Sequence, residues 1–119
     1  MKIGEVSLLT NDVRRLADFY KALFGMENGS DDPVHQFLPA GETALTVYND
    51  GSVKNNLNQN MCLAFTVADV DAEYRRLLGM GVEIVSPPED RPWGARNLCF
   101  LDPDRNRVYL RSFPRPGGE

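Results

Sequence analysis

The chain has 119 residues, of which 42% are hydrophobic and 25% charged, a size and composition that can bury the core of one globular domain. Its net charge of -4 argues against a general nucleic-acid binder, because such proteins gain affinity by neutralising phosphates. No run approaches the roughly 20 apolar residues that span a bilayer, and the N-terminal stretch turns polar too soon for a signal peptide. We therefore expect a cytoplasmic protein that binds neither nucleic acid nor membrane.

Residues 1–50 predict a strand, a helix and three more strands. Residues 2–10 are a short apolar strand, and residues 11–25 then follow helical spacing between a capping Asn or Asp and Gly25. The apolar positions of this helix are Val13, Leu16, Phe19, Tyr20 and Leu23. Three short runs separated by Gly, Pro, Asn and Asp predict a strand meander: residues 26–30, 34–41 and 43–50. The first half is therefore βαβββ.

Residues 61–113 repeat this order of elements. A strand at 61–67 leads into a helix at 68–81 that ends in glycine. Three more strands are predicted after the helix, at 82–86, 95–102 and 107–113. The second half is therefore also βαβββ.

The two halves align at nearly one offset. Asp12 matches Asp69 and Gly25 matches Gly81, which indicates a duplicated module. The stretch between the halves is rich in Asn, Gly and Ser, a composition typical of a flexible linker. The predicted organisation is one domain over 1–119, with module one at 1–50, a linker at 51–60 and module two at 61–113.

We expect an α+β fold in which each module is a mostly antiparallel sheet with one helix on one face. The two sheets together are expected to form a curled, eight-stranded mixed sheet around a cleft. Because side chains alternate along a strand, every second residue of the first and last strands of each module faces that cleft. These residues are Glu5, Ser7, Thr46, Tyr48, Cys62, Ala64, Thr66, Arg107, Tyr109 and Arg111.

Three segments resemble the motifs of one family: NDVRRLADFYKALFGM, AFTVADVDAEYRRLLGMGVEI and PWGARNLCFLDPDRNRVYL. The family is the vicinal oxygen chelate superfamily, which includes glyoxalase I, extradiol dioxygenases, fosfomycin-resistance enzymes and bleomycin-resistance proteins. The resemblance extends over nearly the whole chain. It implies paired βαβββ modules and, in the enzymes, a divalent metal held by side chains from the first and last strands of each module.

The resemblance also locates the four metal-binding positions of those enzymes. They fall at Glu5, at Cys62, at Tyr109 and at either Thr46 or Tyr48. Only Glu5 is a usual ligand. A metal site of the family's type is therefore disfavoured.

The composition leads to the same expectation. The chain has one histidine, His35, so it cannot build a three-histidine site or a site of two histidines and one carboxylate. Glu5 beside a thiol binds magnesium or manganese poorly, because these hard ions need several oxygen ligands. Zinc held by Glu5, Cys62 and water remains the alternative. We expect no cofactor, and we expect His35 at the surface or at a dimer edge.

The remaining cleft resembles that of the bleomycin-resistance branch, in which the same fold binds a small molecule without changing it. The residues assigned to ligand binding are Glu5, Thr46, Tyr48, Cys62, Trp93, Arg96, Tyr109 and Arg111. Trp93 either stacks on a planar or cationic ligand or packs to close the cleft edge, and the tyrosines either orient a ligand or pack on the sheet. Arg96 and Arg111 either bind a carboxylate or phosphate or are solvated like most exposed arginines. Residues 91–119 hold six arginines and three acids, a local charge of +3 that suits an anion site.

Two further expectations concern the cysteines and the last turn. Cys62 and Cys99 belong to no metal-binding spacing and are predicted to be small buried residues in strands, without a disulfide. Asp102 and Asn106 belong to a turn that their side chains stabilise. Arg105 stands where the family usually has glycine, so this turn is either strained or of another type.

The leading hypothesis is a metal-independent homodimer that binds an aromatic or partly anionic small molecule and is not an enzyme. One alternative is a lyase or dioxygenase with an atypical metal site, or a metal-free catalyst with Glu5 as the candidate catalytic base and Tyr109 as acid. Another is a regulatory subunit whose cleft is filled by its own side chains. The fold does not choose among them, because it hosts unrelated chemistries.

Overall fold

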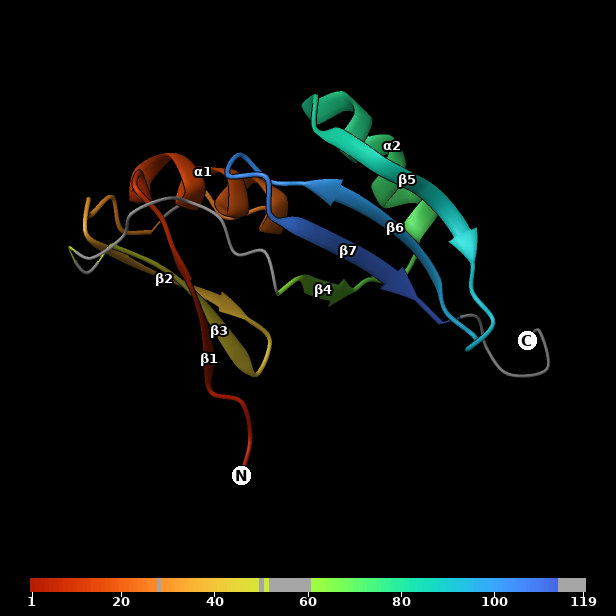
Figure 1. The fold of residues 1–119 in the computed structure, drawn as a ribbon, viewed down its shortest axis with the longest axis horizontal. Coiled ribbons are helices and arrows are strands. Elements are labelled where there is room, and N and C mark those ends of the chain that lie inside the picture. The colour runs from red at the N-terminus through yellow and green to blue at the C-terminus, as the bar shows by residue number, and fades with distance from the viewer. Residues whose placement is uncertain (28, 50, 52–60, 114–119) are drawn as a thin grey trace. The chain divides into compact units, whose positions relative to one another are not determined.

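The computed structural model describes residues 1–27, 29–49, 51 and 61–113. The chain divides into two compact units, Met1–Asn58 and Gln59–Glu119. Each unit has one helix and one sheet, which confirms the α+β class (Figure 1). The predicted linker lies outside the described residues except for Gly51. Neither of the described helices is long and apolar enough to cross a membrane.

Unit 1 contains a three-stranded sheet. Its elements are β1 (Glu5–Leu9), α1 (Val13–Phe24), β2 (His35–Ala40) and β3 (Thr43–Tyr48). The strand order is β1-β3-β2, with β1 parallel and β2 antiparallel to the central β3. α1 packs on β2 and β3, so it covers one face of this sheet.

α1 forms where the sequence predicts it. Asp12 caps its start by accepting a hydrogen bond from the backbone N–H of Arg15 at 3.1 Å. Gly25 ends it with a φ of 73°, a left-handed conformation that glycine adopts without a steric penalty. The buried side of the helix consists of Val13, Leu16, Ala17, Tyr20 and Leu23. The sheet adds Leu38 and Val47, which are 1% and 0% exposed, and together these side chains form the core of unit 1.

The strand predicted at residues 26–30 is wrong. Its described residues lie outside helices and strands, and Asn28 lies outside the described residues. Lys21 of α1 donates a hydrogen bond from Nζ to the backbone carbonyl of Ser30, which takes an acceptor that a strand ladder would use. Met26 is the one apolar side chain of the stretch, so no apolar face favours a place in the sheet. The described part of unit 1 therefore has three strands rather than four.

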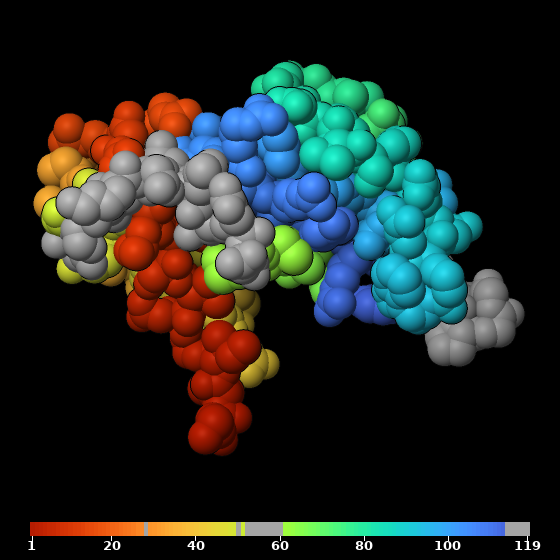
Figure 2. Space-filling model, viewed as in Figure 1, coloured from red at the N-terminus to blue at the C-terminus, as the bar shows by residue number. Residues whose placement is uncertain are grey.

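Unit 2 contains a four-stranded sheet, and all five of its predicted elements are present. They are β4 (Leu63–Thr66), α2 (Val70–Met80), β5 (Glu83–Asp90), β6 (Arg96–Leu101) and β7 (Arg107–Ser112). The strand order is β4-β7-β6-β5, with β4 parallel to β7 and the other pairs antiparallel. α2 packs on β5, β6 and β7, and the space-filling view shows its atoms against those of β5 (Figure 2).

β5 is longer than the predicted strand at 82–86. It continues to Asp90, although its register with β6 shifts on both sides of Ser86. The second shift spans Pro87 and Pro88, which have no backbone N–H to donate. The prolines are tolerated because β5 is an edge strand.

The turn between β6 and β7 is organised by the side chain of Asp102. Its Oδ1 accepts hydrogen bonds from the backbone N–H groups of Asp104 and Asn106, both at 2.9 Å. Its Oδ2 accepts one from the Asn106 amide at 2.8 Å. Arg105 has a φ of 66° and is the one non-glycine residue with positive φ in the described part of the chain. Of the two alternatives for this turn, the structure therefore has the strained one.

Candidate functional site

The eight residues that the sequence assigns to ligand binding are distributed over both units. Unit 1 holds Glu5, Thr46 and Tyr48, and unit 2 holds Cys62, Trp93, Arg96, Tyr109 and Arg111. In each unit the helix covers one face of the sheet, and the strand register determines which of these side chains lie together on the other face.

In unit 1, Glu5 lies beside two hydroxyl groups. The parallel register aligns Ser7 with Thr46, and each hydroxyl donates to Glu5 Oε2 at 3.2 Å. The two hydroxyl oxygens also contact each other. Because the two hydroxyls carry only two protons, the three contacts cannot all be full hydrogen bonds at the same time. Thr46 is 1% exposed whereas Glu5 is exposed. The network therefore fixes a solvent-facing carboxylate on a buried hydroxyl.

The aromatic groups on this face belong to β2 and β3. Tyr48 is half-buried, and its ring meets the His35 ring edge-on, with centroids 5.5 Å apart and planes at 74°. The antiparallel register places these two residues opposite each other and Phe37 opposite Thr46. His35 is exposed, which confirms its predicted surface position, and Phe37 is 56% exposed. Sequence reasoning missed Phe37, although the alternation along β2 could have indicated it.

In unit 2, Tyr109 lies at the middle of β7, paired with Cys99 of β6 and Ala64 of β4. Cys99 is 2% exposed in its strand, as predicted. Burial raises the pKa of the Cys99 thiol, although a side-chain hydrogen bond with Tyr109 acts in the opposite direction. The thiol is therefore protonated at neutral pH and packs as a small apolar group. Only the register brings Cys99 and Tyr109 together, so the sequence alone did not pair them.

The buried strand position predicted for Cys62 is wrong. Cys62 is exposed and precedes β4, which begins at Leu63. The ladder with β7 starts where Leu63 pairs with Val108, which is fully buried. Cys62 lies one residue before that point and on the alternate side, so it gains no burial from the core.

Arg111 is held by two neighbours on its own face of the sheet. Its Nε donates to Thr66 Oγ1 at 3.1 Å, and its guanidinium carbon lies 5.0 Å from the centroid of the Phe113 ring. Tyr109 and Arg107 precede it at alternate positions of β7 and therefore share this face. In the described part of the chain, neither Arg107 nor Arg111 forms an ion pair.

Arg96 is not part of this group. Its guanidinium binds Asp71 of α2 through two hydrogen bonds, from Nε at 2.9 Å and from Nη2 at 3.0 Å, and it also pairs with Asp90 at 3.1 Å. Hydrogen bonding to Arg96 holds the pKa of Asp71 below its usual value, and the same contacts raise the pKa of Arg96. The predicted ligand residue therefore joins β6 to the helix on the other side of the sheet.

Trp93 lies in the turn between β5 and β6. The turn is closed by hydrogen bonds between Arg91 and Ala95 at 2.7 Å and between Gly94 and Arg91 at 3.1 Å. The Trp93 residue is 68% exposed. Because most of its surface is open, it does not pack against a strand of unit 2, and its indole is available for stacking.

The fold agrees with a comparison of the sequence with known families. Residues 2–110 match the Glyoxalase/Bleomycin resistance protein/Dioxygenase superfamily. The chain belongs to this superfamily. The resemblance found in the three sequence segments is thereby confirmed.

Several known proteins are similar to this chain. The uncharacterized protein YraH of Bacillus subtilis (strain 168) is 29% identical over 92% of this chain and 97% of its own length. The anthracycline biosynthesis protein DnrV of Streptomyces peucetius is 30% identical over 85% of this chain, which spans only 38% of DnrV. A crystal structure of a glyoxalase-related enzyme from Fulvimarina pelagi aligns with a TM-score of 0.79 at 21% identity, over 96% of this chain and 89% of that one. The last comparison shows a shared fold.

The donor atoms within each unit do not form the metal site of the superfamily's enzymes. In unit 1 the corresponding positions supply one carboxylate, from Glu5, with the hydroxyl of Thr46 or the phenol of Tyr48. In unit 2 they supply the thiol of Cys62, which lies outside its strand, and the phenol of Tyr109. Among the residues that the structure describes, no three His, Cys, Asp or Glu side chains come together. Hard divalent ions need several oxygen ligands, and neither set supplies them.

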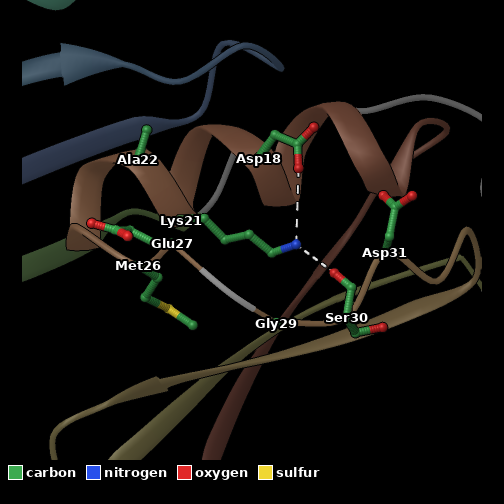
Figure 3. Close-up of a pocket in the computed structure, with 8 residues that line it drawn as sticks. All are labelled: Asp18, Lys21, Ala22, Met26, Glu27, Gly29, Ser30 and Asp31. Carbon is green, nitrogen blue, oxygen red and sulfur yellow. Dashed lines mark hydrogen bonds and ion pairs between the residues drawn. The ribbon is translucent and has the colours of Figure 1, made fainter.

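A hollow of about 430 Å³ lies between α1 and the chain segment that follows it (Figure 3). It is lined by Asp18, Lys21, Ala22, Met26, Glu27, Gly29, Ser30 and Asp31. Lys21 is already engaged there, by the carbonyl of Ser30 and by Asp18 at 3.9 Å. The hollow contains no predicted site residue and no aromatic ring, so it does not match the ligand chemistry that the sequence suggests.

Proposed function

We propose that this member of the superfamily binds a planar organic molecule without a metal ion and does not transform it. The donor set at the family's metal positions is the observation that carries the proposal. Glu5 is the one carboxylate among them, and its Oε2 already accepts hydrogen bonds from Ser7 and Thr46. Tyr109 stands where the family has its usual acid on β7, and it is paired in the strand register with Cys99, whose thiol is protonated. Phenol and alcohol groups orient an organic ligand well but hold a divalent ion weakly.

The aromatic side chains support a planar ligand. Tyr109 and Phe113 lie beside Arg111 in unit 2, and Trp93 presents an open indole at the turn before β6. Because DnrV is an anthracycline biosynthesis protein, an anthracycline is a reasonable first probe for this chain. We also propose that the protein acts as a cytoplasmic homodimer, which sedimentation equilibrium of the full chain would check.

The test measures ligand and metal binding on the same protein. The chain has one tryptophan, so quenching of Trp93 fluorescence reports on ligands that stack near it. We expect an anthracycline to quench this fluorescence saturably and with the same affinity before and after dialysis against EDTA. We also expect less than 0.1 equivalent of zinc, nickel or manganese, roughly, to remain after gel filtration, because hard and borderline ions lack a ligand set here.

Glu5→Gln is the matched variant for this test. It keeps the shape of the side chain and removes its charge, so ligand binding without a metal should survive in it. Stoichiometric metal retention by the wild type that is lost in Glu5→Gln would overturn the proposal. Turnover of thiohemiacetals, catechols or epoxides above background would favour the enzyme alternative.

A further inference from the structure

The outward face of β7 carries an arginine, a tyrosine and a second arginine in alternation. Arg107, Tyr109 and Arg111 are spaced by two residues, so they lie roughly 6.6 Å apart along one face of the sheet. Arg107 and Arg111 are exposed and Tyr109 is half-buried. The stripe therefore offers two cations and an aromatic ring to the same small molecule.

The positive charge of this stripe is not neutralised by the neighbouring acids. Glu89 pairs with Arg91 at 3.1 Å, and Glu83 pairs with Arg105 at 3.1 Å, so both acids nearest the stripe on β5 already have a cation. In the described residues, Arg107 and Arg111 have no carboxylate partner. Although the chain as a whole has a charge of -4, this face is locally positive.

Arg111 is also pre-oriented. Thr66 accepts its Nε hydrogen at 3.1 Å, and the Phe113 ring lies 5.0 Å from its guanidinium carbon. These contacts hold the guanidinium plane while both Nη groups donate to no acceptor among the described residues. Arg96 on the opposite face shows the contrast, because its Nε and both Nη groups bind Asp71 and Asp90. An oriented arginine with free Nη donors is suited to the two oxygens of a carboxylate.

A further donor lies next to Arg111 in the strand register. Asn97 of β6 is paired with Arg111, and its Oδ1 accepts a hydrogen bond from Arg91 Nε at 2.9 Å. Since the Asn97 oxygen is occupied, its Nδ2 is the group available to a ligand, and this group is a donor. Donors therefore predominate around Arg111, which favours an acceptor-only group such as a carboxylate.

We infer that the outward face of β7 is a binding site for a planar aromatic carboxylate, with the carboxylate on Arg111 and Asn97 and the ring on Tyr109. This inference rests on the proposed function, since it names the chemical class of the bound molecule. A flat carboxylate matches the planar guanidinium through two parallel hydrogen bonds, and the ring gains contact with Tyr109 and Phe113. Arg107 adds attraction at the other end of the stripe.

The probe for the test is 2-naphthoate, compared with neutral 2-naphthamide and with 2-naphthyl phosphate. Binding is followed in ¹H–¹⁵N spectra of the full chain, including the Arg Nε signals. We expect saturable shifts at Thr66, Tyr109 and Arg111 with naphthoate. Naphthamide should bind about five- to tenfold more weakly, because it lacks the charge-assisted hydrogen bonds.

Three variants separate a specific site from general attraction. Arg111→Gln should weaken naphthoate binding about five- to tenfold and leave naphthamide binding unchanged, and Arg111→Lys should lie between it and the wild type. Arg75→Gln removes the same charge from exposed α2 and should change nothing. Thermal unfolding of each variant verifies that it is folded.

Equal weakening by Arg75→Gln and Arg111→Gln would overturn the inference, as would shifts confined to other residues or no saturable binding. Preference for the phosphate by more than about tenfold would overturn the assignment to a carboxylate. These outcomes differ from failure of the proposed function, which is metal retention dependent on Glu5. Naphthoate binding at Arg111 and metal binding at Glu5 are measured independently.

Discussion

Arg105 differs from the residue that the superfamily motif has at the same position of the turn. The superfamily motif has glycine at this turn position, and Arg105 has to adopt a φ of 66° there. A side chain in the left-handed region costs about 1 kcal/mol, since its Cβ approaches the following carbonyl. Hydrogen bonds within the turn hold this conformation: three to the Asp102 side chain, one from Arg105 N–H to the Asp102 carbonyl at 2.8 Å, and one from Asp102 N–H to the Asn106 carbonyl at 3.0 Å.

Replacing Arg105 with glycine should therefore stabilise the protein. We expect Arg105→Gly to raise the free energy of unfolding by about 1 kcal/mol, measured by urea denaturation. Glu83→Gln is the control, because it removes the ion pair with Arg105 at 3.1 Å and leaves the backbone unchanged. This pair is exposed on both sides, so its loss should have little effect. If Arg105→Gly were less stable than the wild type, the contacts of the Arg105 side chain would contribute more to the free energy of unfolding than the backbone strain removes.

The two cysteines differ in accessibility, which predicts different reactivity. Cys62 is exposed, whereas Cys99 is buried and burial raises the pKa of its thiol. The thiolate is the reactive form, so Cys99 is both hidden and protonated. We expect one thiol of the native chain to react rapidly with Ellman's reagent at pH 8, and the second only in urea.

Two variants assign these thiols. Cys62→Ser should abolish the rapid reaction, and Cys99→Ser should keep it. Two rapid thiols in the native wild type would show that β6 opens readily at Cys99. Because Cys99 pairs with Tyr109, such opening would also disturb the proposed ligand face.

At the scale of elements, the pair of Arg96 and Asp71 joins β6 to the start of α2. Hydrogen bonding to Arg96 lowers the pKa of Asp71 in the folded protein. Because the pKa of Asp71 is lower in the folded protein, the pair stabilises the fold at every pH above the pKa that Asp71 has in the unfolded chain, which is about 3.9. This stabilisation is lost as the pH falls from there through the folded pKa.

The variant Asp71→Asn should therefore be less stable than the wild type at pH 7, and the difference should shrink as the pH falls below the unfolded pKa of about 3.9 and vanish below the folded pKa. Urea midpoints measured from pH 7 to pH 3 would show the convergence. Glu73→Gln is the matched control, since Glu73 is also an acid of the first turn of α2 but pairs with Arg76 of the same helix. If both variants behave alike, the effect belongs to the helix dipole rather than to the contact with β6.

At the scale of the whole molecule, the two modules share the same helix caps and order of elements, but their outward-facing side chains are different. Both helices begin at an Asp cap and end at a left-handed glycine, Gly25 or Gly81. The outward side chains differ, because unit 1 presents the hydroxyl-bound Glu5 and unit 2 presents Arg107 and Arg111. Duplication thus preserved the elements that fold each module, while the exposed positions changed independently.

The sequence by itself determined the α+β class, the duplicated order of elements, the superfamily and nine of the ten predicted helix and strand positions. These features depend on local signals: capping residues, glycines and apolar periodicity act within a few neighbouring positions. The missing strand at 26–30 shows the limit of such signals. Turn residues mark the ends of the stretch, but Lys21 of α1 binds the backbone carbonyl of Ser30, which a neighbouring strand would otherwise use.

Only the tertiary structure decided which predicted site residues act together. Register between the consecutive strands β6 and β7 placed Cys99 against Tyr109, and register between β4 and β7, which are distant in the sequence, placed Thr66 against Arg111. Packing of α2 on the sheet brought Arg96 to Asp71. The parity of one strand can be predicted from its own residues. Its partners cannot, because they depend on the pairing of segments up to about half the chain apart. The position of Tyr109 came from the motif and its shared face with Arg107 and Arg111 from strand alternation, whereas its thiol neighbour Cys99 came from the fold.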